Sequence, residues 1–599
     1  MSRSVKKSVS DKTLIIVESP SKANKIQEYL GSDYIVTASK GHITDLIKGG
    51  PYNLGVDLNT FTPRYTVSPD KVNTLNELMN LAKQSKLILL SSDPDREGEA
   101  ISWHLYERLK DVDVPIKRIV FNEITKAAIK KAVASPRDID MDLVHAQEAR
   151  RMLDRIVGFM ASPFLMNCLK SKLSAGRVQS VVTKMIIDRE KEIGSFLPED
   201  YWNIHVSLSD GSDIFTCKYD TKITDQKTAD SVKTSLESNN SFVVSEVVAK
   251  DEKRAPFAPL ITSKLQQIMS KDYGFSADRT MKAAQELYEN GYCTYIRTDS
   301  TRIGDDALDS VRDWLKNNNY DIPDKANVYQ NKDSSQDAHE CIRPTEIELK
   351  PDQNYEIIDA DQKKVYEVIW KFFVSSQMKP AIYNTLKVTL HPQGNAKFKI
   401  KASGKALKYK GFLELLGIGD DSKIDIPMLN VGDIVNLHGK QPVKAEKKQT
   451  QPPPRFSEAN LIKELVNKDI GRPATYAELL TKITGRNYVE KQGNIYHGTD
   501  LGKKICDILD SNFTFMDYNY TSEMEKKLDS IANKNLNYVE MLKSFYQEFK
   551  KELDNAYINN GGELCVRCGS YMAERTTKNG EKFFGCTAYP NCKFTKNIS

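Results

Sequence analysis

Two continuous apolar segments near the start of the chain, each ending in acidic residues, constrain its fold most strongly. Residues 13–19 read TLIIVES and residues 86–92 read KLILLSS, so Glu18 closes the first segment and Asp93 follows the second. Apolar runs of this length, with helix-like stretches between them, are typical of buried strands in a parallel sheet. The sequence therefore predicts an α/β domain in which Glu18 and Asp93 lie at the same edge of the sheet.

The acidic residues at this sheet edge favour a divalent metal site. Four carboxylates gather there, those of Glu18, Asp93, Asp95 and Glu97. They would repel one another without a cation, and hard oxygen ligands of this kind suit Mg²⁺. A solvated acidic turn is the alternative interpretation, and the paired strand ends make it the weaker one. Lys22 could hold a phosphate oxygen as a point charge. His42 could also contact a phosphate, but it is a weak signal alone.

Residues 295–300, Tyr-Ile-Arg-Thr-Asp-Ser, place an arginine beside a tyrosine. We expect the β-like run YCTYI at residues 292–296 to be a short strand, which would put Tyr295 and Arg297 on one face. A guanidinium there would stabilise a phenolate and a pentavalent phosphorane, although most tyrosines are simply packing residues. A similar pairing of His339 with Arg343 follows a polar loop predicted at residues 316–337.

Two further segments are candidates for binding phosphate. In the first, Arg151 and Arg155 share one face of a predicted helix that also contains Arg150 and Asp154. In the second, a Ser-Ala-Gly sequence at a helix start would offer free backbone N–H groups, in the run Ser174, Ala175, Gly176, Arg177, Val178 and Gln179. An ordinary solvated basic helix face is the alternative interpretation.

Four of the nine cysteines form a C-terminal group, Cys565, Cys568, Cys586 and Cys592, and the other five are scattered. Two short-spaced pairs separated by a longer loop are typical of a tetrahedral four-sulfur Zn²⁺ site. This distribution argues against a disulfide framework and for a reduced compartment. Aromatic residues and lysines between the thiols suit stacking on unpaired bases, although some of the aromatics must pack the small core.

Composition excludes several other classes of protein. A length of 599 residues suggests about four domains, and a net charge of +5 does not by itself identify a nucleic-acid binder. No apolar run is long enough for a membrane span. The polar, basic start lacks the apolar core of a secretory signal, so we expect residues 1–12 to be a disordered leader and the protein to be cytoplasmic or nucleoid-associated.

The longer motifs together resemble the type IA DNA topoisomerases of the bacterial topoisomerase I type. The resemblance extends over roughly residues 13–545 and includes the C-terminal ribbon. The motifs occur in the order of that family, and they read IIVESPSKA, SSDPDREGEAISWHL, VFNEITK, ARRMLDRIVGFMASP, LSAGRVQS, TYIRTDST, AHECIRPT and RFSEANLIKELVNKDIGRPATYAELL.

The resemblance implies a multidomain protein of α/β, α and β parts, in which a Toprim α/β domain, helical domains and a β-rich arch close a toroid before one zinc ribbon. The expected ranges are 13–141 for the Toprim domain, 142–192 and 451–558 for a helical groove domain, 193–255 and 382–450 for the arch, 256–381 for the helical domain with the catalytic tyrosine, and 563–598 for the ribbon. We also expect a linker-like stretch at residues 443–455 and helices from 457 to about 556.

The resemblance also implies individual roles. Tyr295 would be the nucleophile that takes the 5′-phosphate, with Glu18, Lys22, Arg297 and His339 as catalytic helpers, and the four acids would bind Mg²⁺. The single-strand groove would contain His42, Arg150, Arg151, Asp154, residues 174–179, Arg343, Arg472 and Thr475. Many relatives carry several ribbons where this chain has one, which leaves the chemistry unaffected.

The implied activity is relaxation of negatively supercoiled DNA by a monomer that binds single-stranded regions of underwound duplex. The absence of a G-x-x-x-x-G-K-[ST] loop agrees with a reaction that needs no nucleotide. Three alternatives stay open: a topoisomerase III-like decatenase of the same family, a Toprim nuclease, and a single-strand DNA-binding protein.

Overall fold

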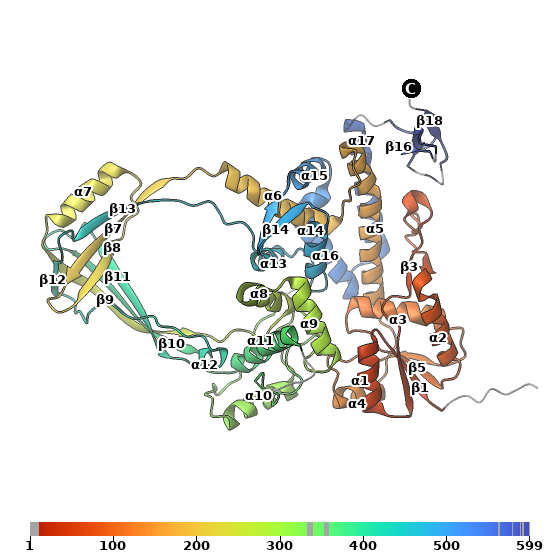
Figure 1. Ribbon diagram of the computed structural model, residues 1–599, viewed down its shortest axis with the longest axis horizontal. Helices are drawn as coiled ribbons and strands as arrows, with labels where there is room; N and C mark the ends of the chain where they lie inside the picture. The colour runs from red at the N-terminus through yellow and green to blue at the C-terminus, as the bar shows by residue number, and fades with distance from the viewer. Residues whose placement is uncertain are drawn as a thin grey trace, which may run out of the picture.

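The computed structural model describes residues 11–331, 339–352, 359–560, 563–577, 579–587, 589 and 592–597. The leader expected at 1–12 lies almost entirely outside the described residues, as does the end of the polar loop expected at 316–337. Figure 1 shows a ring, in which a β-rich arch lies opposite a body of helices and an α/β domain. The expected multidomain architecture with a closed toroid is therefore confirmed.

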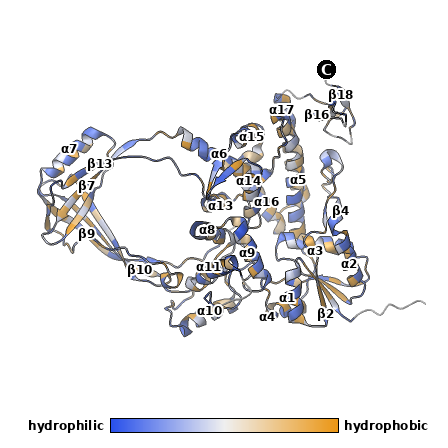
Figure 2. Ribbon diagram, in the orientation of Figure 1, coloured by the Kyte–Doolittle hydropathy of each residue, from blue (hydrophilic) through white to orange (hydrophobic). Residues whose placement is uncertain are grey.

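The N-terminal domain is built on the two predicted apolar strands. Its parallel sheet has the order β2-β1-β5-β6, and every residue of β1 is buried, in keeping with the apolar strands coloured orange in Figure 2. The strands are β1 (Thr13–Val17), β2 (Tyr34–Ala38), β5 (Leu87–Leu90) and β6 (Ile116–Arg118), with a hairpin of β3 (Thr44–Leu46) and β4 (Tyr65–Val67), and the helices are α1 (Pro20–Leu30), α2 (Val72–Ala82), α3 (Arg96–Leu109) and α4 (Lys126–Ala134).

The helical body joins two segments that are far apart in the sequence. Its longest helix, α5 (Met141–Leu169), starts at the N-cap residue Asp140 and packs against α16 and α17. The other helices are α6 (Arg177–Ser195), α13 (Glu458–Asn467), α14 (Tyr476–Gly485), α15 (Asp500–Asp510), α16 (Tyr518–Ala532) and α17 (Tyr538–Asn559).

The helices expected from residue 457 are present, but a hairpin of β14 (Val489–Gln492) and β15 (Ile495–Gly498), which was not expected, interrupts them. Its strands are too short for alternation to show in the sequence. They turn at Gly493, whose φ of 58° lies in the left-handed region.

The arch is a seven-stranded antiparallel sheet in the order β12-β9-β10-β11-β8-β7-β13, with a further β12–β7 pairing. Helix α7 (Gln226–Glu237) packs against β7 and β13. Residues 443–455 are not simply a linker, because their first half forms β13 and pairs with β7. The strands are β7 (Asp200–Ser209), β8 (Ile214–Tyr219), β9 (Ser241–Arg254), β10 (Ala381–Pro392), β11 (Ile400–Tyr409), β12 (Ile434–Leu437) and β13 (Val443–Gln449).

The charged side chains of β13 are the reason that the sequence pattern did not predict this strand. Lys447 bonds to Asp200 on β7, and most of β13 is exposed, so its lysines remain in water while its backbone completes the sheet.

The tyrosine-bearing segment, residues 256–381, contains α8 (Thr262–Tyr273), α9 (Ala277–Glu289), α10 (Asp305–Asn317) and α11 (Ala360–Ser376), and the short α12 (Leu413–Leu416) packs beside α11. Its apolar core is continuous with one side of the N-terminal sheet. The strand expected at residues 292–296 is absent from this described stretch. Tyr295 N–H donates instead to Asn122 O at 2.7 Å and Thr294 N–H to Arg343 O at 2.9 Å, so the backbone bonds go to separate partners.

The C-terminal ribbon is a small antiparallel sheet of β16 (Met572–Thr576), β17 (Lys582–Cys586) and β18 (Thr595–Asn597). It lies against the ends of α5 and α17, as Figure 1 shows at the upper right. Tyr571 belongs to the same buried apolar cluster as Phe164 and Tyr557 of those helices. Short 3-10 turns at Pro51–Asn53, Pro69–Lys71 and Thr514–Met516 complete the fold. Over the described part of the chain, no helix is both long and apolar enough to cross a membrane.

Candidate active site and nucleic-acid groove

The predicted acidic residues meet at the carboxyl edge of the parallel sheet. Glu18 follows β1, and its Oε1 accepts a hydrogen bond of 2.7 Å from the backbone N–H of Asp93. Asp95 is the N-cap of α3 and accepts from the N–H of Gly98 at 2.8 Å. A side chain at Gly98 would bring its Cβ within 2.2 Å of the Asp93 carbonyl oxygen, so this tight turn requires glycine. Glu97 lies in the first turn of α3.

Three of these acids pair with side chains from separate segments of the chain. Lys22 on α1 donates to Asp93 Oδ1 at 2.5 Å, and His42 Nε2 lies 2.6 Å from Glu97 Oε1. The Tyr295 hydroxyl donates to Asp95 Oδ2 at 2.6 Å, across 200 residues of sequence. The structure thus brings the predicted nucleophile directly onto the predicted metal site.

Two other predicted residues approach the same point. Arg297 Nη1 lies 3.9 Å from the Asp95 oxygen that accepts from Tyr295. His339 Nε2 donates to the backbone oxygen of Pro94, within the acidic turn, at 2.6 Å. Tyr295, Arg297 and His339 therefore converge even though their segment is not a strand.

Burial and mutual repulsion dominate the titration of this cluster. Burial, followed by the charge of Asp93, raises the pKa of Glu18 to about 7. Burial would also raise the pKa of Glu97, but the hydrogen bond and charge of His42 outweigh it and lower that pKa to about 2. Burial and then the charges of Asp95 and Asp93 raise the pKa of Tyr295 well above its usual value, and Arg297 opposes them. Tyr295 therefore needs nearby positive charge to act as a nucleophile.

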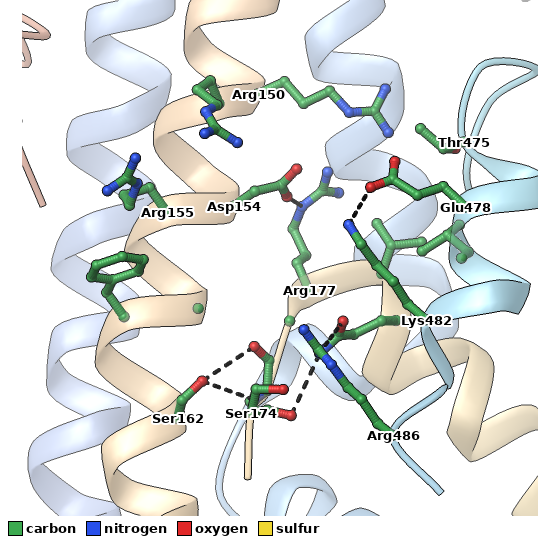
Figure 3. A pocket seen from close by; sticks show the side chains of 18 of the residues that line it. Arg150, Asp154, Arg155, Ser162, Ser174, Arg177, Thr475, Glu478, Lys482 and Arg486 are labelled. Atoms are coloured by element: carbon green, nitrogen blue, oxygen red, sulfur yellow. Dashed lines mark hydrogen bonds and ion pairs between the residues drawn. The ribbon is translucent and has the colours of Figure 1, made fainter. Parts of the chain in front are cut away.

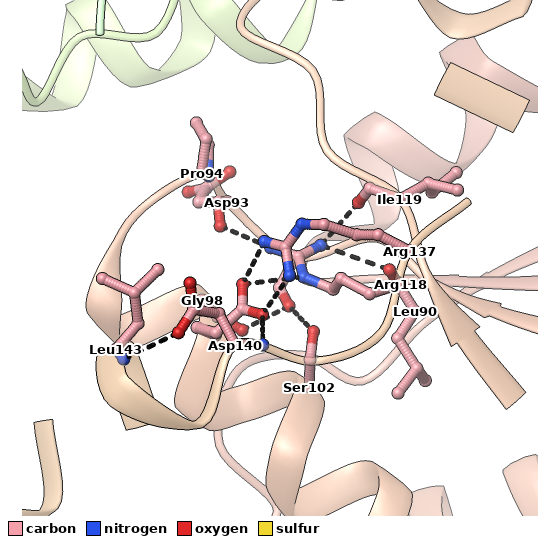
Figure 4. A network of polar contacts seen from close by, with 12 residues as sticks. Leu90, Asp93, Pro94, Gly98, Ser102, Arg118, Ile119, Arg137, Asp140 and Leu143 are labelled. Carbon is pink, nitrogen blue, oxygen red and sulfur yellow. Dashed lines mark hydrogen bonds and ion pairs between the residues drawn. The ribbon is translucent and has the colours of Figure 1, made fainter. Parts of the chain in front are cut away.

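A buried ionic network that the sequence analysis missed supports the acidic turn from beneath (Figure 4). Arg118 is completely buried, and it donates to Glu99 Oε2 at 3.1 Å and to the backbone oxygen of Asp93 at 2.8 Å. Arg137 donates to both oxygens of Glu99 at 2.7 and 2.9 Å. The motifs DREGE and KRIVFNEITK contain Glu99 and Arg118, but a charged residue in a helix or strand normally indicates an exposed face.

A basic groove with a volume of about 570 Å³ lies between α5, the start of α6 and α14. Figure 3 shows Arg150, Asp154 and Arg155 on one wall, facing Glu478, Lys482 and Arg486 on the other. The predicted residues Arg150, Arg151, Asp154, Ser174, Ala175, Gly176, Arg177, Val178, Gln179 and Thr475 all line it. The spacing of residues 478, 482 and 486 along one helix face is the signal that could have identified the second wall.

The groove leads to the acidic centre through a smaller pocket of about 120 Å³. Arg150 and Thr475 line both cavities, and Asp95, Arg297 and His339 line only the smaller one. Arg472 also lines the smaller pocket and donates to Asp529 at 2.6 Å. The smaller pocket is thus lined by Asp95, the carboxylate to which the hydroxyl of Tyr295 donates.

Two predicted groove arginines occupy other positions. Arg177 touches the groove, but its side chain is buried, with Nη2 at 2.7 Å from Glu525 Oε1 and Nε at 3.4 Å from Asp154 Oδ1. Arg343 lines neither cavity and instead bonds to Glu123 at 2.9 Å and to Glu340 at 3.0 Å. His42 lies beside the acidic centre rather than in the groove, in a neighbouring pocket.

The four C-terminal cysteines form a compact cluster whose sulfur atoms all lie within 4.8 Å of one another. Two of the S···S distances are 3.7 Å, between Cys565 and Cys592, and 3.4 Å, between Cys568 and Cys586. Tetrahedral Zn²⁺ with Zn–S bonds of about 2.3 Å requires S···S separations of about 3.8 Å. The thiols therefore fit a structural Zn²⁺ site.

A parallel sheet edge with clustered carboxylates, a tyrosine bonded to them and a basic groove leading to both define a protein built for phosphoryl transfer on a nucleic-acid strand. The family models that match are a DNA topoisomerase model over residues 138–543, a Toprim domain over 13–124 and a topoisomerase DNA-binding C4 zinc finger over 562–599. The chain belongs to the type IA DNA topoisomerase family and is an isomerase, as the sequence motifs indicated.

Individual relatives agree with this assignment. The chain is 37% identical to DNA topoisomerase 1 of Salmonella typhimurium and of Escherichia coli, with 98% of this chain and 73% of each relative covered. It is 38% identical to DNA topoisomerase 1 of Haemophilus influenzae, with 98% and 74% covered. The structure of full-length topoisomerase I from Thermotoga maritima superposes with a TM-score of 0.80 at 35% identity, covering 98% of this chain and 97% of that one.

We predict that Zn²⁺ binding depends on the clustered thiols. The double substitution Cys568→Ser and Cys586→Ser removes two of four ligands, so metal analysis should fall from about one zinc per chain to none. Cys168→Ser, at a partly buried cysteine outside the four-thiol cluster, is the matched control and should retain the metal. Full zinc content in the double variant would contradict the site.

We predict that Glu525 stabilises the groove wall in a pH-dependent way. Burial would raise its pKa, but the charges of Arg150, Arg177 and Arg472 outweigh burial and lower it to about 2. Because the folded-state pKa lies below the unfolded one, the contribution is complete above about pH 5 and is lost as the pH falls towards 2. Glu525→Gln should therefore lower the free energy of unfolding at pH 7 by about 3 kcal/mol, and by less at pH 3.5.

Urea unfolding of both proteins at the two pH values measures this difference. Glu523→Gln is the control, because Glu523 is exposed on the same helix. An equal effect of Glu525→Gln at both pH values would contradict the assigned charge pairing.

Proposed function

We propose that this chain relaxes negatively supercoiled DNA by breaking one strand transiently, with Tyr295 as the nucleophile, and that it needs Mg²⁺ but no nucleotide. One observation carries the proposal: the Tyr295 hydroxyl bonds to Asp95 within the acidic sheet edge, where the basic groove ends. DNA is the expected partner of a topoisomerase with a C4 zinc finger. Since every residue of the proposed site comes from one chain, we propose a monomer, associated with the nucleoid through the DNA it binds.

The groove would hold the strand and deliver one phosphodiester to Tyr295. Arginines of α5 would contact phosphates. The backbone N–H groups of Ser174, Ala175 and Gly176 are not free as expected, because they donate to the hydroxyls of Tyr488, Ser162 and Ser180. Unpaired DNA fits such a groove better than duplex, so binding would favour underwound regions.

Strand cleavage would then be a transesterification. The phenolic oxygen of Tyr295 forms a bond to phosphorus, the bond from phosphorus to the 3′ oxygen breaks, and the 3′ oxygen becomes a hydroxyl by taking up the proton that the phenol releases. Asp95 Oδ2 already accepts the phenolic hydrogen and is the nearest group to take the proton. Arg297 would stabilise the charge that develops on the phosphorane. The phosphotyrosine ester preserves the bond energy for resealing, which is why no nucleotide is required.

The acidic residues fit a divalent cation. Burial, followed by the charge of Asp93, raises the pKa of Glu18 to about 7, and a cation beside it would favour its ionised form. Glu18, Asp93, Asp95 and Glu97 would hold Mg²⁺, which when bound neutralises negative charge beside the phosphate and the 3′ oxygen. Lys22, whose Nζ lies beside Asp93, would contact a phosphate oxygen of the strand.

We predict that Tyr295→Phe abolishes the covalent step only. The variant lacks the phenolic oxygen, so it should bind single-stranded oligonucleotide normally but form no denaturant-resistant adduct. Tyr292→Phe, three residues earlier in the same segment, should form adducts at the wild-type level. In the wild-type protein the DNA fragment that begins with the 5′-phosphate should remain covalently attached to the protein. The other fragment, which ends in the 3′-hydroxyl, should be released in denaturant. Attachment of that second fragment instead would contradict the proposal.

We predict that the double substitution Asp93→Asn and Asp95→Asn weakens the metal site and also removes the carboxylate that accepts the phenolic hydrogen of Tyr295. It removes two charged ligands while keeping the side-chain shapes, so relaxation of negatively supercoiled plasmid should require at least about tenfold more Mg²⁺ or stop altogether. The matched control is the double substitution Asp111→Asn and Asp113→Asn. These two exposed residues have the same spacing and follow the end of α3 in the same domain. Normal relaxation by the first variant in limiting Mg²⁺, without ATP, would refute the metal site.

A further inference from the structure

The tyrosine-bearing segment contacts the rest of the ring at two separate places. One contact is the catalytic centre, where Tyr295, His339 and Arg343 meet the Toprim domain. In the other, α8 packs on α13 and α9 packs on α14, as the centre of Figure 1 shows. The chain connects this segment to the remainder through the strands β9 and β10 of the arch. Passing a second strand through the ring requires both contacts to separate while the arch stays joined.

A buried carboxylate lies at the second contact. Glu458 is the first residue of α13 and only 2% exposed. Its Oε1 accepts from the backbone N–H of Ala277, the first residue of α9. Its Oε2 accepts from Lys491 and, at 3.2 Å, from the hydroxyl of Tyr496. Nearby, Asn494 Nδ2 donates to Ser270 O at 3.1 Å, a second polar bond across the same contact.

This arrangement makes the contact easy to open and close again. The first N–H groups of a helix have no partner within the helix, and its N-terminus attracts negative charge, so Glu458 suits this end of α9. When α9 moves away, Glu458 keeps Lys491 and Tyr496, which lie on its own side in the β14–β15 hairpin. No buried charge is stranded, and the N–H of Ala277 passes to water.

The apolar part of the contact is small. Within the described residues of the tyrosine-bearing segment, Ala277 alone belongs to the buried apolar cluster that contains Leu461 and Leu480. Large apolar interfaces are permanent, whereas small polar ones separate and re-form. Directional bonds therefore contribute to the contact beside the packing of α8 on α13 and of α9 on α14.

Helix α9 connects the two contacts. It begins at Ala277 beside Glu458, and near its other end the ring of Tyr288 lies 5.3 Å from that of Tyr295 and 5.0 Å from Lys22 Nζ. On this basis, and resting on the function proposed above, we propose that Glu458 is the latch of the strand-passage gate: a positioning residue that holds α9 in the closed ring and releases it while the cleaved strand is attached to Tyr295.

The test measures opening and cleavage separately in the full-length chain. A single-stranded DNA tether held under tension in Mg²⁺ reports each opening of one bound enzyme as a step in extension. Glu458→Ala should raise the ratio of open to closed time about tenfold, as expected for losing one hydrogen bond to a charged group. Glu458→Gln, which keeps an oxygen for Ala277, should give an intermediate ratio. Oligonucleotide cleavage should stay within about twofold of wild type.

The matched control is Glu464→Ala on the same helix, because Glu464 forms a partly exposed pair with Lys468 at 3.5 Å and should leave the ratio unchanged. If Glu458→Ala folds and its ratio of open to closed time is unchanged, the proposed role of Glu458 is wrong. Loss of oligonucleotide cleavage in folded Glu458→Gln would also contradict it. If Glu458→Ala does not fold, the Glu458→Gln ratio decides. Wild-type enzyme that cleaves but never opens would instead contradict strand passage in the proposed function.

Discussion

Mutual repulsion among the carboxylates at one edge of a parallel sheet is the constraint on which the rest of this structure depends. Two strand ends and one helix start gather these acids where water is scarce, and the raised pKa of Glu18 reflects the resulting strain on ionisation. The chain relieves it with Lys22, His42 and the Tyr295 hydroxyl, each from a different segment. The tyrosine-bearing segment is thereby held on the Toprim domain by the same acids that would bind the metal.

Buried carboxylates that accept hydrogen bonds or ion pairs recur at other places in the ring. Glu99 binds two arginines beneath the acidic turn, Glu525 lies among three arginines behind the groove, and Glu458 joins α13 to α9. A buried carboxylate is weak evidence for net stability, because desolvation offsets much of the attraction. A buried carboxylate requires hydrogen-bond donors at defined positions, however, so each of these carboxylates constrains the orientation of the segments around it. We infer that these carboxylates set the alignment of groove, turn and gate, while the apolar clusters supply most of the stability.

These contacts also differ in what happens when they are broken. The pair of Arg177 and Glu525 is fully buried, and Asp154 and Arg150 pair with its two members within the same helical body, so that wall should stay intact during turnover. Separating Ala277 from Glu458 leaves the carboxylate with two partners of its own domain. The balance of bonds on each side of a contact therefore distinguishes the rigid body of the ring from the boundary at which it would open.

The sequence by itself determined the parallel sheet, the acidic edge, the four-cysteine site and the family, because apolar runs, ligand spacing and long motifs are local properties. Only the tertiary structure decided the remainder. The segment of Tyr295 is not a strand, β13 hides in a lysine-rich stretch, Arg343 pairs with Glu123 and Glu340, and the interface role of Glu458 has no local signature. Whether a charged residue faces water, a ligand or a buried partner depends on segments hundreds of residues away. The local sequence pattern shows the spacing between residues along the chain, whereas tertiary packing determines which other side chains each residue contacts.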